Sequence, residues 1–449
     1  MRVAIINHAA SPGLVPNDAT DTVIAMTDAR AATGTVLRRL ALPVYLPVIA
    51  GTFGLALLIP VLPLYLTRSG VPLGTASFVL AAAGAGAMLG GLPAGALIAR
   101  FGEYRVLIAA LSGIGATTAL LGISDAALVL IGLRLGTGAS NIGLRLSRQT
   151  YITRRVETAA RGRSMAMIGG SFRVSLFLGP LVGGLLAETI GFSATFVIAG
   201  AFSTIGMIPA LIHHAEHGDG LSEATDPVPI EARQRLGLFT TINEHRRLLA
   251  TAGVVPMLTM AVREGRYVIV PLVGDDLGLS VAAVGALVAV GTLADLVLFP
   301  VAGLVMDRFG RLAAMIPSFS LIAVGLLLLG LADSTGGAIV AGIVMGVGNG
   351  LSSGTMLTLG SDLAPRADPA PFLAAIAVIQ DMGKVIGPLL VGAVGAWLGL
   401  GAAAIALAVL MIMVIAWLAL VLGETSSYHA DMERAHPSGG VVDAGSDTR

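Results

Sequence analysis

Long apolar runs separated by short polar segments recur along most of the chain. Twelve runs come close to the roughly 20 residues that a helix needs to cross the hydrocarbon core of a bilayer. They lie at 42–66, 76–99, 106–123, 127–147, 165–187, 193–212, 249–273, 280–305, 312–332, 337–360, 372–396 and 402–422. This pattern predicts an all-α polytopic membrane protein with twelve transmembrane helices.

The composition agrees with this class. Of the 449 residues, 55% are hydrophobic and only 12% are charged, whereas a soluble domain carries about 25% charged residues. A soluble enzyme is therefore excluded on composition. The formal net charge is zero, so no basic surface for nucleic acid is expected. The chain has no cysteine, which excludes disulfides, thiolate metal sites and cysteine nucleophiles.

The basic residues are distributed unevenly between the two sides of the expected membrane. Of the 27, 21 fall on the side of both termini, including six (Arg145, Arg148, Arg154, Arg155, Arg161 and Arg163) assigned to the loop between the fourth and fifth spans. The opposite side holds only Arg68. Basic residues accumulate on the cytoplasmic side, so we expect cytoplasmic termini in a multi-pass protein of the inner cell membrane. Acids interrupt the first forty residues, which argues against a signal peptide.

An internal repeat appears at an offset of 208 residues. The shift aligns Gly95–Gly102 with Gly303–Gly310, Gly179-Pro180-Leu181 with Gly387-Pro388-Leu389, Gly184 with Gly392, and Asn141 with Asn349. Such a period indicates a parallel duplication. It predicts an N-terminal tail (1–41), a six-helix bundle (42–212), a cytoplasmic linker (213–248), a second six-helix bundle (249–422) and a C-terminal tail (423–449).

Three motifs resemble those of the major facilitator superfamily. That family's signature Gly-x-Leu-Ala-Asp-Arg-x-Gly-Arg is nearly intact after the eighth span, with Gly303, Asp307, Arg308, Gly310 and Arg311 in place. The first-half copy keeps Gly95, Arg100 and Gly102 but has Ala99 for the Asp and Glu103 for the Arg. The others are Arg134-x-x-x-Gly138 and Gly179-Pro180-x-x-Gly183-Gly184, the latter similar to a motif common in drug-exporting antiporters.

The resemblance implies the major facilitator fold and a conformational latch. In that family the charges of the signature hold one conformation by contacting helix ends of the other half. Ordinary loop charge is the alternative interpretation, and Ala99 puts the first-half latch in question. We expect Gly95 and Gly303 to let a neighbouring helix approach closely. Ser171, Ser175, Gly179 and Gly183 recur every four residues and predict a face for helix packing.

Charged residues inside the expected spans are candidates for substrate binding and coupling. A charge at mid-membrane costs about 2.5–3.5 kcal/mol on insertion scales, so such residues have functional roles by default. The basic members are Arg134, Arg173, Arg263, Arg266 and Lys384, and the acidic ones are Glu264, Asp295 and Asp381. The surplus of bases favours an anionic or zwitterionic substrate.

Helical depth predicts one ion pair between the halves. At 1.5 Å per residue, Arg173 and Asp295 reach similar depths on the fifth and eighth spans, which face each other in the family. The pair could break and re-form during transport, or it could be a static packing contact. The 208 shift places Arg173 on Asp381. Asp381 and Lys384 share a helix face and can neutralise each other.

The seventh span carries three adjacent candidates. Arg263 and Arg266 share a helix face and Glu264 points about 100° away. The family resemblance implies that this helix lines a central cavity, so the three are candidates for substrate contact, with Glu264 the first candidate for proton coupling. Lys384, unlike an arginine, can lose its proton when buried, and it is the chain's only lysine.

Together these features predict a secondary transporter working by alternating access. Proton-coupled efflux of a drug or metabolite is the first hypothesis, and proton symport that imports an anionic or zwitterionic metabolite is the second. A non-transporting sensor or scaffold is a third. A membrane enzyme is disfavoured because the histidines lie in tails and the linker, where His213, His214 and His217 fit a solvated loop better than a metal site. We expect a monomer in the lipid bilayer with a small-molecule substrate and protons as partners, and no nucleic acid, metal, cofactor or nucleotide site.

Overall fold

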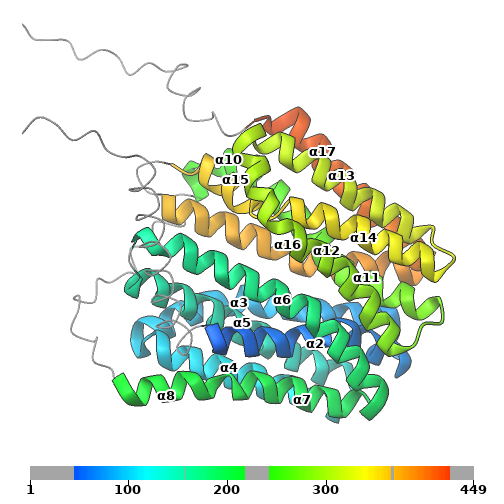
Figure 1. Cartoon of the computed structure of the whole chain (residues 1–449), viewed down its shortest axis with the longest axis horizontal. Coiled ribbons are helices and arrows are strands. Elements are labelled where there is room, and N and C mark those ends of the chain that lie inside the picture. Colours follow the sequence, from blue (N-terminus) through cyan, green and yellow to red (C-terminus); the bar gives the residue numbers. More distant parts are fainter. Residues whose placement is uncertain (1–44, 157, 218–241, 366–368, 425–449) are drawn as a thin grey trace, which may run out of the picture.

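The protein folds as a bundle of long helices. The computed structural model describes residues 45–156, 158–217, 242–365 and 369–424, and every regular element in these ranges is helical (Figure 1). The N-terminal helices are α2 (Leu46–Arg68), α3 (Leu73–Phe101), α4 (Glu103–Ala119), α5 (Ala127–Arg155), α6 (Thr158–Ile190), α7 (Phe192–Ile205) and α8 (Met207–His217). The C-terminal helices are α10 (Arg246–Ala252), α11 (Val254–Asp276), α12 (Val281–Phe309), α13 (Arg311–Gly330), α14 (Thr335–Leu351), α15 (Thr355–Leu363), α16 (Pro369–Leu398) and α17 (Leu400–Trp417).

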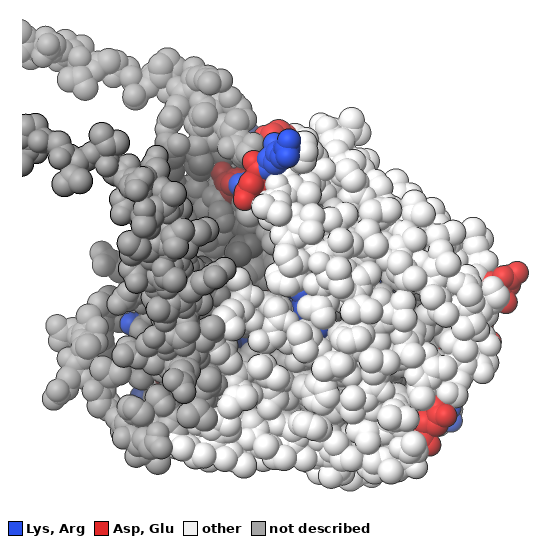
Figure 2. Space-filling view, in the orientation of Figure 1, with Lys and Arg blue, Asp and Glu red and all other residues white. Residues whose placement is uncertain are grey.

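Ten described segments are long and apolar enough to cross a membrane. The other two expected spans are also helical. One is α11, which carries Arg263, Glu264 and Arg266, and the other is α14, which has only 17 residues. Figure 2 shows a face with almost no charge between its two ends, as expected for a surface in contact with lipid. Twelve crossings and cytoplasmic termini remain predictions.

Two helix boundaries differ from the sequence prediction. The expected loop after the fourth span is wrong, because α5 continues through Arg145, Arg148 and Arg154 and ends at Arg155. The expected span 337–360 is interrupted, because α14 ends at Leu351 and α15 begins at Thr355. Gly354 lies in the break with φ +82°, a left-handed conformation that glycine adopts without steric cost.

The helix contacts repeat between the two parts of the chain. The pairs α2–α6, α3–α5 and α4–α7 correspond to α11–α16, α12–α14 and α13–α17. Three pairs of positive-φ glycines also obey the 208 offset: Gly70 and Gly278, Gly102 and Gly310, and Gly191 and Gly399. Between the two parts, α6 packs on α12 and α3 on α16. This arrangement agrees with a parallel duplication; the domain limits remain an interpretation.

The two ends of the bundle differ in how closely the helices of the two parts pack. We call the end where α2 and α11 finish the Arg68 end, and the end with the α12–α13 turn the Gly310 end. Near the Arg68 end, a Cβ on Gly184 would lie 2.7 Å from the Val281 carbonyl oxygen, and one on Gly392 would overlap Ser77. Gly184 and Gly392 are related by the 208 shift. The α6–α12 contact and the α3–α16 contact therefore each use a glycine near this end.

At the Gly310 end, the expected close approach at Gly95 and Gly303 is wrong for this conformation. A Cβ on either residue would meet no described atom within 4 Å. The absence of a side chain at these two positions therefore serves no close packing against the described helices.

Candidate functional site

The ion pair predicted between Arg173 and Asp295 is present. Arg173 on α6 donates from Nε to Asp295 Oδ1 on α12 at 3.3 Å, and its guanidinium lies 4.6 Å from the centre of the Phe299 ring. The Asp295 side chain is 4% exposed and that of Arg173 is 19% exposed. A pair so shielded from water is much less screened than a surface pair.

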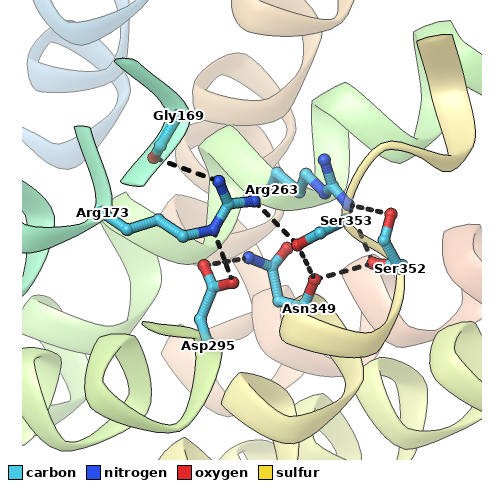
Figure 3. A network of polar contacts seen from close by, with 7 residues as sticks. All are labelled: Gly169, Arg173, Arg263, Asp295, Asn349, Ser352 and Ser353. Carbon is cyan, nitrogen blue, oxygen red and sulfur yellow. Dashed lines mark hydrogen bonds and ion pairs between the residues drawn. The ribbon is translucent and has the colours of Figure 1, made fainter. Parts of the chain in front are cut away.

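The break between α14 and α15 completes the surroundings of this pair (Figure 3). Arg173 Nη2 donates to Ser353 Oγ at 2.7 Å, and Asn349 Nδ2 donates to Asp295 Oδ2 at 2.7 Å. On the other side, Arg263 of α11 donates to Ser352 Oγ at 2.8 Å. The network thus joins α6 of the first part to three helices of the second.

Ser352 and Ser353 were not predicted as site residues, and Asn349 was noted only as a repeat position. The available signal was the Ser-Ser-Gly sequence at 352–354 inside an apolar run, since Ser-Gly dipeptides mark turns. In the first part the equivalent positions are Leu144, Arg145 and Leu146, and there the helix is unbroken.

A second cluster crosses the other contact between the parts. Arg145 on α5 donates to Asp381 Oδ2 on α16 at 2.9 Å, and Lys384 Nζ lies 2.9 Å from the other oxygen of the same carboxylate. The Asp381–Lys384 pair was expected. Arg145 was wrongly assigned to the loop after the fourth span, since it lies inside α5, which continues to Arg155.

Glu264 lies among these charges without an ion pair of its own. Its electrostatic neighbours are Lys384, Arg134, Asp381 and Arg266. Within the described parts of the chain, no side chain donates a hydrogen bond to its carboxylate. Because Arg134 comes from α5 and Lys384 from α16, this glutamate of α11 is close to charges from both halves of the repeat.

Three arginines near Glu264 also lack carboxylate partners. Among the described residues, Arg134, Arg263 and Arg266 form no ion pair. Arg134 Nε, Arg263 Nε and Arg266 Nη2 are buried nitrogens without a hydrogen-bond acceptor. Arg266 is the most enclosed, with 6% of its surface exposed. Unpaired buried charge is costly, so these donors favour a site that some other molecule completes.

The family signature at the Gly310 end makes its contacts within the second half of the chain. Arg311 Nε lies 2.9 Å from Asp362 Oδ2 of α15, and Glu424 accepts from the backbone nitrogens of Arg311 and Leu312 at 3.1 and 3.0 Å. Asp307 lies in the electrostatic surroundings of Arg311. Of the residues described, none on α2–α8 bonds to Asp307, Arg308 or Arg311, so the expected latch to the other half is not made in this conformation.

The first-half copy of the signature has the same ion pair with its charges exchanged. Glu103 occupies the position of Arg311 and Arg154 that of Asp362, since both are displaced by 208 residues. Arg154 Nη1 lies 3.2 Å from Glu103 Oε2. The glutamate that departs from the family pattern is therefore matched by an arginine near the end of the following helix, α5. Arg100 of this copy stacks on the Phe101 ring at 5.2 Å.

The motif on α6 packs helices together, as expected. A Cβ on Gly179 would overlap Ala56, and one on Gly183 would overlap the Leu57 carbonyl. Pro180 presents its carbonyl oxygen to Gly285 of α12. Gly138 of α5, from the Arg134-x-x-x-Gly138 motif, similarly packs against the backbone of Ala83 on α3. Small residues thus bring α6 against both α2 and α12.

Polar contacts also join the halves at the Arg68 end. Arg68 Nη2 lies 2.6 Å from Asp275 Oδ1, which connects the last turns of α2 and α11. Glu188 Oε2 accepts from the backbone nitrogen of Ala282 at 2.7 Å, at the start of α12. A carboxylate at this position is favoured by the helix dipole.

A metal centre has no support in the part of the chain described. No group of three or more histidine, aspartate or glutamate side chains there is arranged to hold an ion. The side chains of His213, His214 and His217 lie outside the described set, as do both tails and residues 218–241.

Comparison with known proteins gives the same family as the motifs. The model of the Major Facilitator Superfamily matches residues 45–263 and 252–439. A triacylglyceride transporter of Mycobacteroides abscessus is 26% identical over 42% of this chain, and the match spans 37% of that protein's length. The class C tetracycline resistance protein of Escherichia coli is 26% identical over 67% of this chain and 75% of its own.

A solved structure shares the fold. The crystal structure of a POT family transporter bound to a thioalcohol-conjugated peptide superposes with a TM-score of 0.69 over 84% of this chain and 95% of that one, at 14% identity. Since the family model covers most of the sequence, this chain belongs to the major facilitator superfamily of transporters.

Proposed function

We propose that this protein is a secondary active transporter that exports a small molecule by alternating access, driven by proton entry. The observation that carries the proposal is Glu264. It is a membrane-embedded carboxylate without an ion pair or hydrogen bond among the described residues, close to Lys384 and Arg134. A carboxylate in such surroundings can bind and release a proton as its neighbours move.

Alternating access is supported by the unequal packing of the two ends. The Arg68 end is closed by Arg68–Asp275 and by the glycine contacts of Gly184 and Gly392. At the Gly310 end, a Cβ on Gly95 or Gly303 would meet no described atom within 4 Å, and among the described residues the signature makes no hydrogen bond or ion pair to the other half. A transporter that rocks about a midplane site would form the contacts missing here when the Arg68 end opens.

The export direction is proposed from the α6 motif and from the tetracycline resistance protein that the chain matches. The decisive test uses the full chain in proteoliposomes with an imposed pH gradient. Tetracycline is the first substrate, followed by other amphipathic compounds identified by resistance screening in a host without its own exporters. Wild type should transport with the gradient and lose this dependence in Glu264→Gln.

The matched control is Asp333→Asn, which removes an exposed carboxylate between α13 and α14. It should keep gradient-driven flux. Flux in Glu264→Gln that still follows the gradient would reject Glu264 as the coupling residue, and absence of any flux in wild type across the compounds would reject the export function.

Import of an anionic metabolite by proton symport is the second candidate. The unpaired guanidiniums of Arg134, Arg263 and Arg266 favour it. The two modes predict opposite directions of substrate movement under the same pH gradient, so the same vesicles distinguish them.

A further inference from the structure

The centre of the bundle holds more positive charge than its own carboxylates neutralise. Asp295 pairs with Arg173, and Asp381 is shared by Arg145 and Lys384. Glu264 is then the one remaining acid of the eight charges predicted inside the spans, opposite the unpaired Arg134, Arg263 and Arg266. At least two positive charges are left without a counter-charge from the described chain.

The unpaired donors come from both halves, and shared electrostatic neighbours connect them: Arg134 and Arg266 through Glu264, and Arg263 through Arg266. Arg263 and Arg266 lie three residues apart on α11, on one helix face. Arg134 is on α5 and shares Glu264 as an electrostatic neighbour with Arg266. Arg263 keeps Nη2 on the Ser352 hydroxyl but leaves Nε without an acceptor.

Arginine is suited to a particular kind of ligand. Its planar guanidinium offers parallel N–H donors that match the two oxygens of a carboxylate or phosphate. A neutral ligand could accept hydrogen bonds from these donors but would leave the surplus charge in place, whereas an oxyanion would both pair the donors and neutralise the charge.

We infer that the transported substrate carries a carboxylate or phosphate group, which Arg134, Arg263 and Arg266 bind between the two halves of the bundle. The inference rests on the proposed transport function and specifies its substrate class. Glu264 shares electrostatic neighbours with these arginines. An anion bound there would favour the protonated glutamate, so substrate and proton would bind together, which is the coupling of the symport candidate rather than of proton-driven export.

The test measures binding directly and needs no gradient. The purified full chain in neutral detergent is titrated at constant chloride with three matched pairs of probes: benzoate and benzamide, succinate and succinamide, and phenyl phosphate and phenol. The thermal unfolding midpoint is followed. At least one anion should raise the midpoint saturably while its neutral partner does not.

The variants identify the residues. Arg263→Gln and Arg266→Gln should each weaken binding of that anion about tenfold or more, since a charge-assisted hydrogen bond is lost. Arg247→Gln is the matched control, because it removes an exposed guanidinium on α10 and should leave the affinity unchanged. If Arg263→Gln does not fold, Arg263→Lys replaces it. This variant keeps the positive charge and should bind the anion more weakly but measurably.

Several outcomes would overturn the inference. These are no preference for any anion over its neutral partner, equal stabilisation by chloride alone, and unchanged affinity in the α11 variants. Failure of the transport proposal is recognised separately. Arginine-dependent anion binding without gradient-driven flux would reject proton coupling and keep the substrate class, whereas coupled flux restricted to neutral or cationic compounds would do the reverse.

Discussion

The Arg145 guanidinium lies 2.9 Å from the Asp381 carboxylate, on helices from different halves of the chain. Moving both positions by the repeat offset of 208 gives Ser353 and Arg173, which are 2.7 Å apart. Equivalent positions therefore contact each other at both places where the two halves meet. At the first the guanidinium belongs to Arg145 of α5, and at the second it belongs to Arg173 of α6.

Double-mutant analysis should show coupling between Arg145 and Asp381. Asp381→Asn should destabilise more than Arg145→Ala, because it removes the partner of two cations, and Asp381 is the more buried member. The coupling free energy should be about 1 kcal/mol, within the range for contacting residues. Unfolding in detergent measures it. Additive effects of the two substitutions would show that the contact contributes nothing to stability.

Asp295→Ala should be among the more destabilising single changes in the chain. It leaves the Arg173 guanidinium buried without its carboxylate, at a cost of about 3 kcal/mol, and deprives Asn349 of its acceptor. The double variant Arg173→Ala/Asp295→Ala should lose less than the sum. The transport rate per folded molecule then distinguishes a gating role of the pair from a static packing role. If the pair is a gate, the double variant should have an altered rate. If it is a static packing contact, the double variant should be less stable but transport at the wild-type rate.

Exchanging the charges of Glu103 and Arg154 should restore the stability that either single charge reversal removes. Glu103→Arg places two arginines together, and Arg154→Glu places two glutamates together. The combination Glu103→Arg/Arg154→Glu reproduces the polarity of Arg311–Asp362. Since Arg154 is 54% exposed, Arg154→Glu should cost at most about 1 kcal/mol, and Glu103→Arg, at a side chain only 9% exposed, should cost more. If the combination is less stable than both single variants, the pair is not equivalent to its second-half copy.

Glycine substitutions at the two ends of the bundle should differ in their effect on the unfolding midpoint. Gly184→Val should lower the unfolding midpoint, because its Cβ alone would lie 2.7 Å from a carbonyl oxygen of α12. Gly95→Val, whose Cβ would meet no described atom within 4 Å, should leave the midpoint nearly unchanged and yet reduce transport, since the proposed cycle requires the Gly310 end to close. Full transport by Gly95→Val would argue against closure at this residue.

Cross-linking the Arg68 end should stop transport reversibly. The chain has no cysteine, so Arg68→Cys/Asp275→Cys carries the only two thiols. A bis-methanethiosulfonate reagent that spans them should abolish flux, and reduction should restore it. Each single-cysteine variant treated in the same way serves as control and should keep its activity. Undiminished flux in the cross-linked protein would contradict alternating access through this end.

The fold class followed from local features of the sequence. Apolar runs of membrane-spanning length, the 208-residue repeat and the signature at Gly303–Arg311 are each readable without knowledge of contacts. Even the Arg173–Asp295 pair could be predicted, because regular helical rise converts sequence position into depth and the family resemblance implied that the fifth and eighth spans face each other. These inferences succeeded because the bilayer and the helix impose simple periodic rules on the chain.

The sequence by itself determined the kind of protein, its repeat and the residues whose charge the membrane penalises. Only the tertiary structure decided their partners. The continuation of α5 brings Arg145 to Asp381, the break at Ser352–Gly354 presents two hydroxyls to arginines, and Arg154 compensates Glu103. These contacts join residues from 51 to 236 positions apart. A charge interacts with whatever the packing brings within a few ångströms, and that depends on how helices end and cross, which no local pattern specifies.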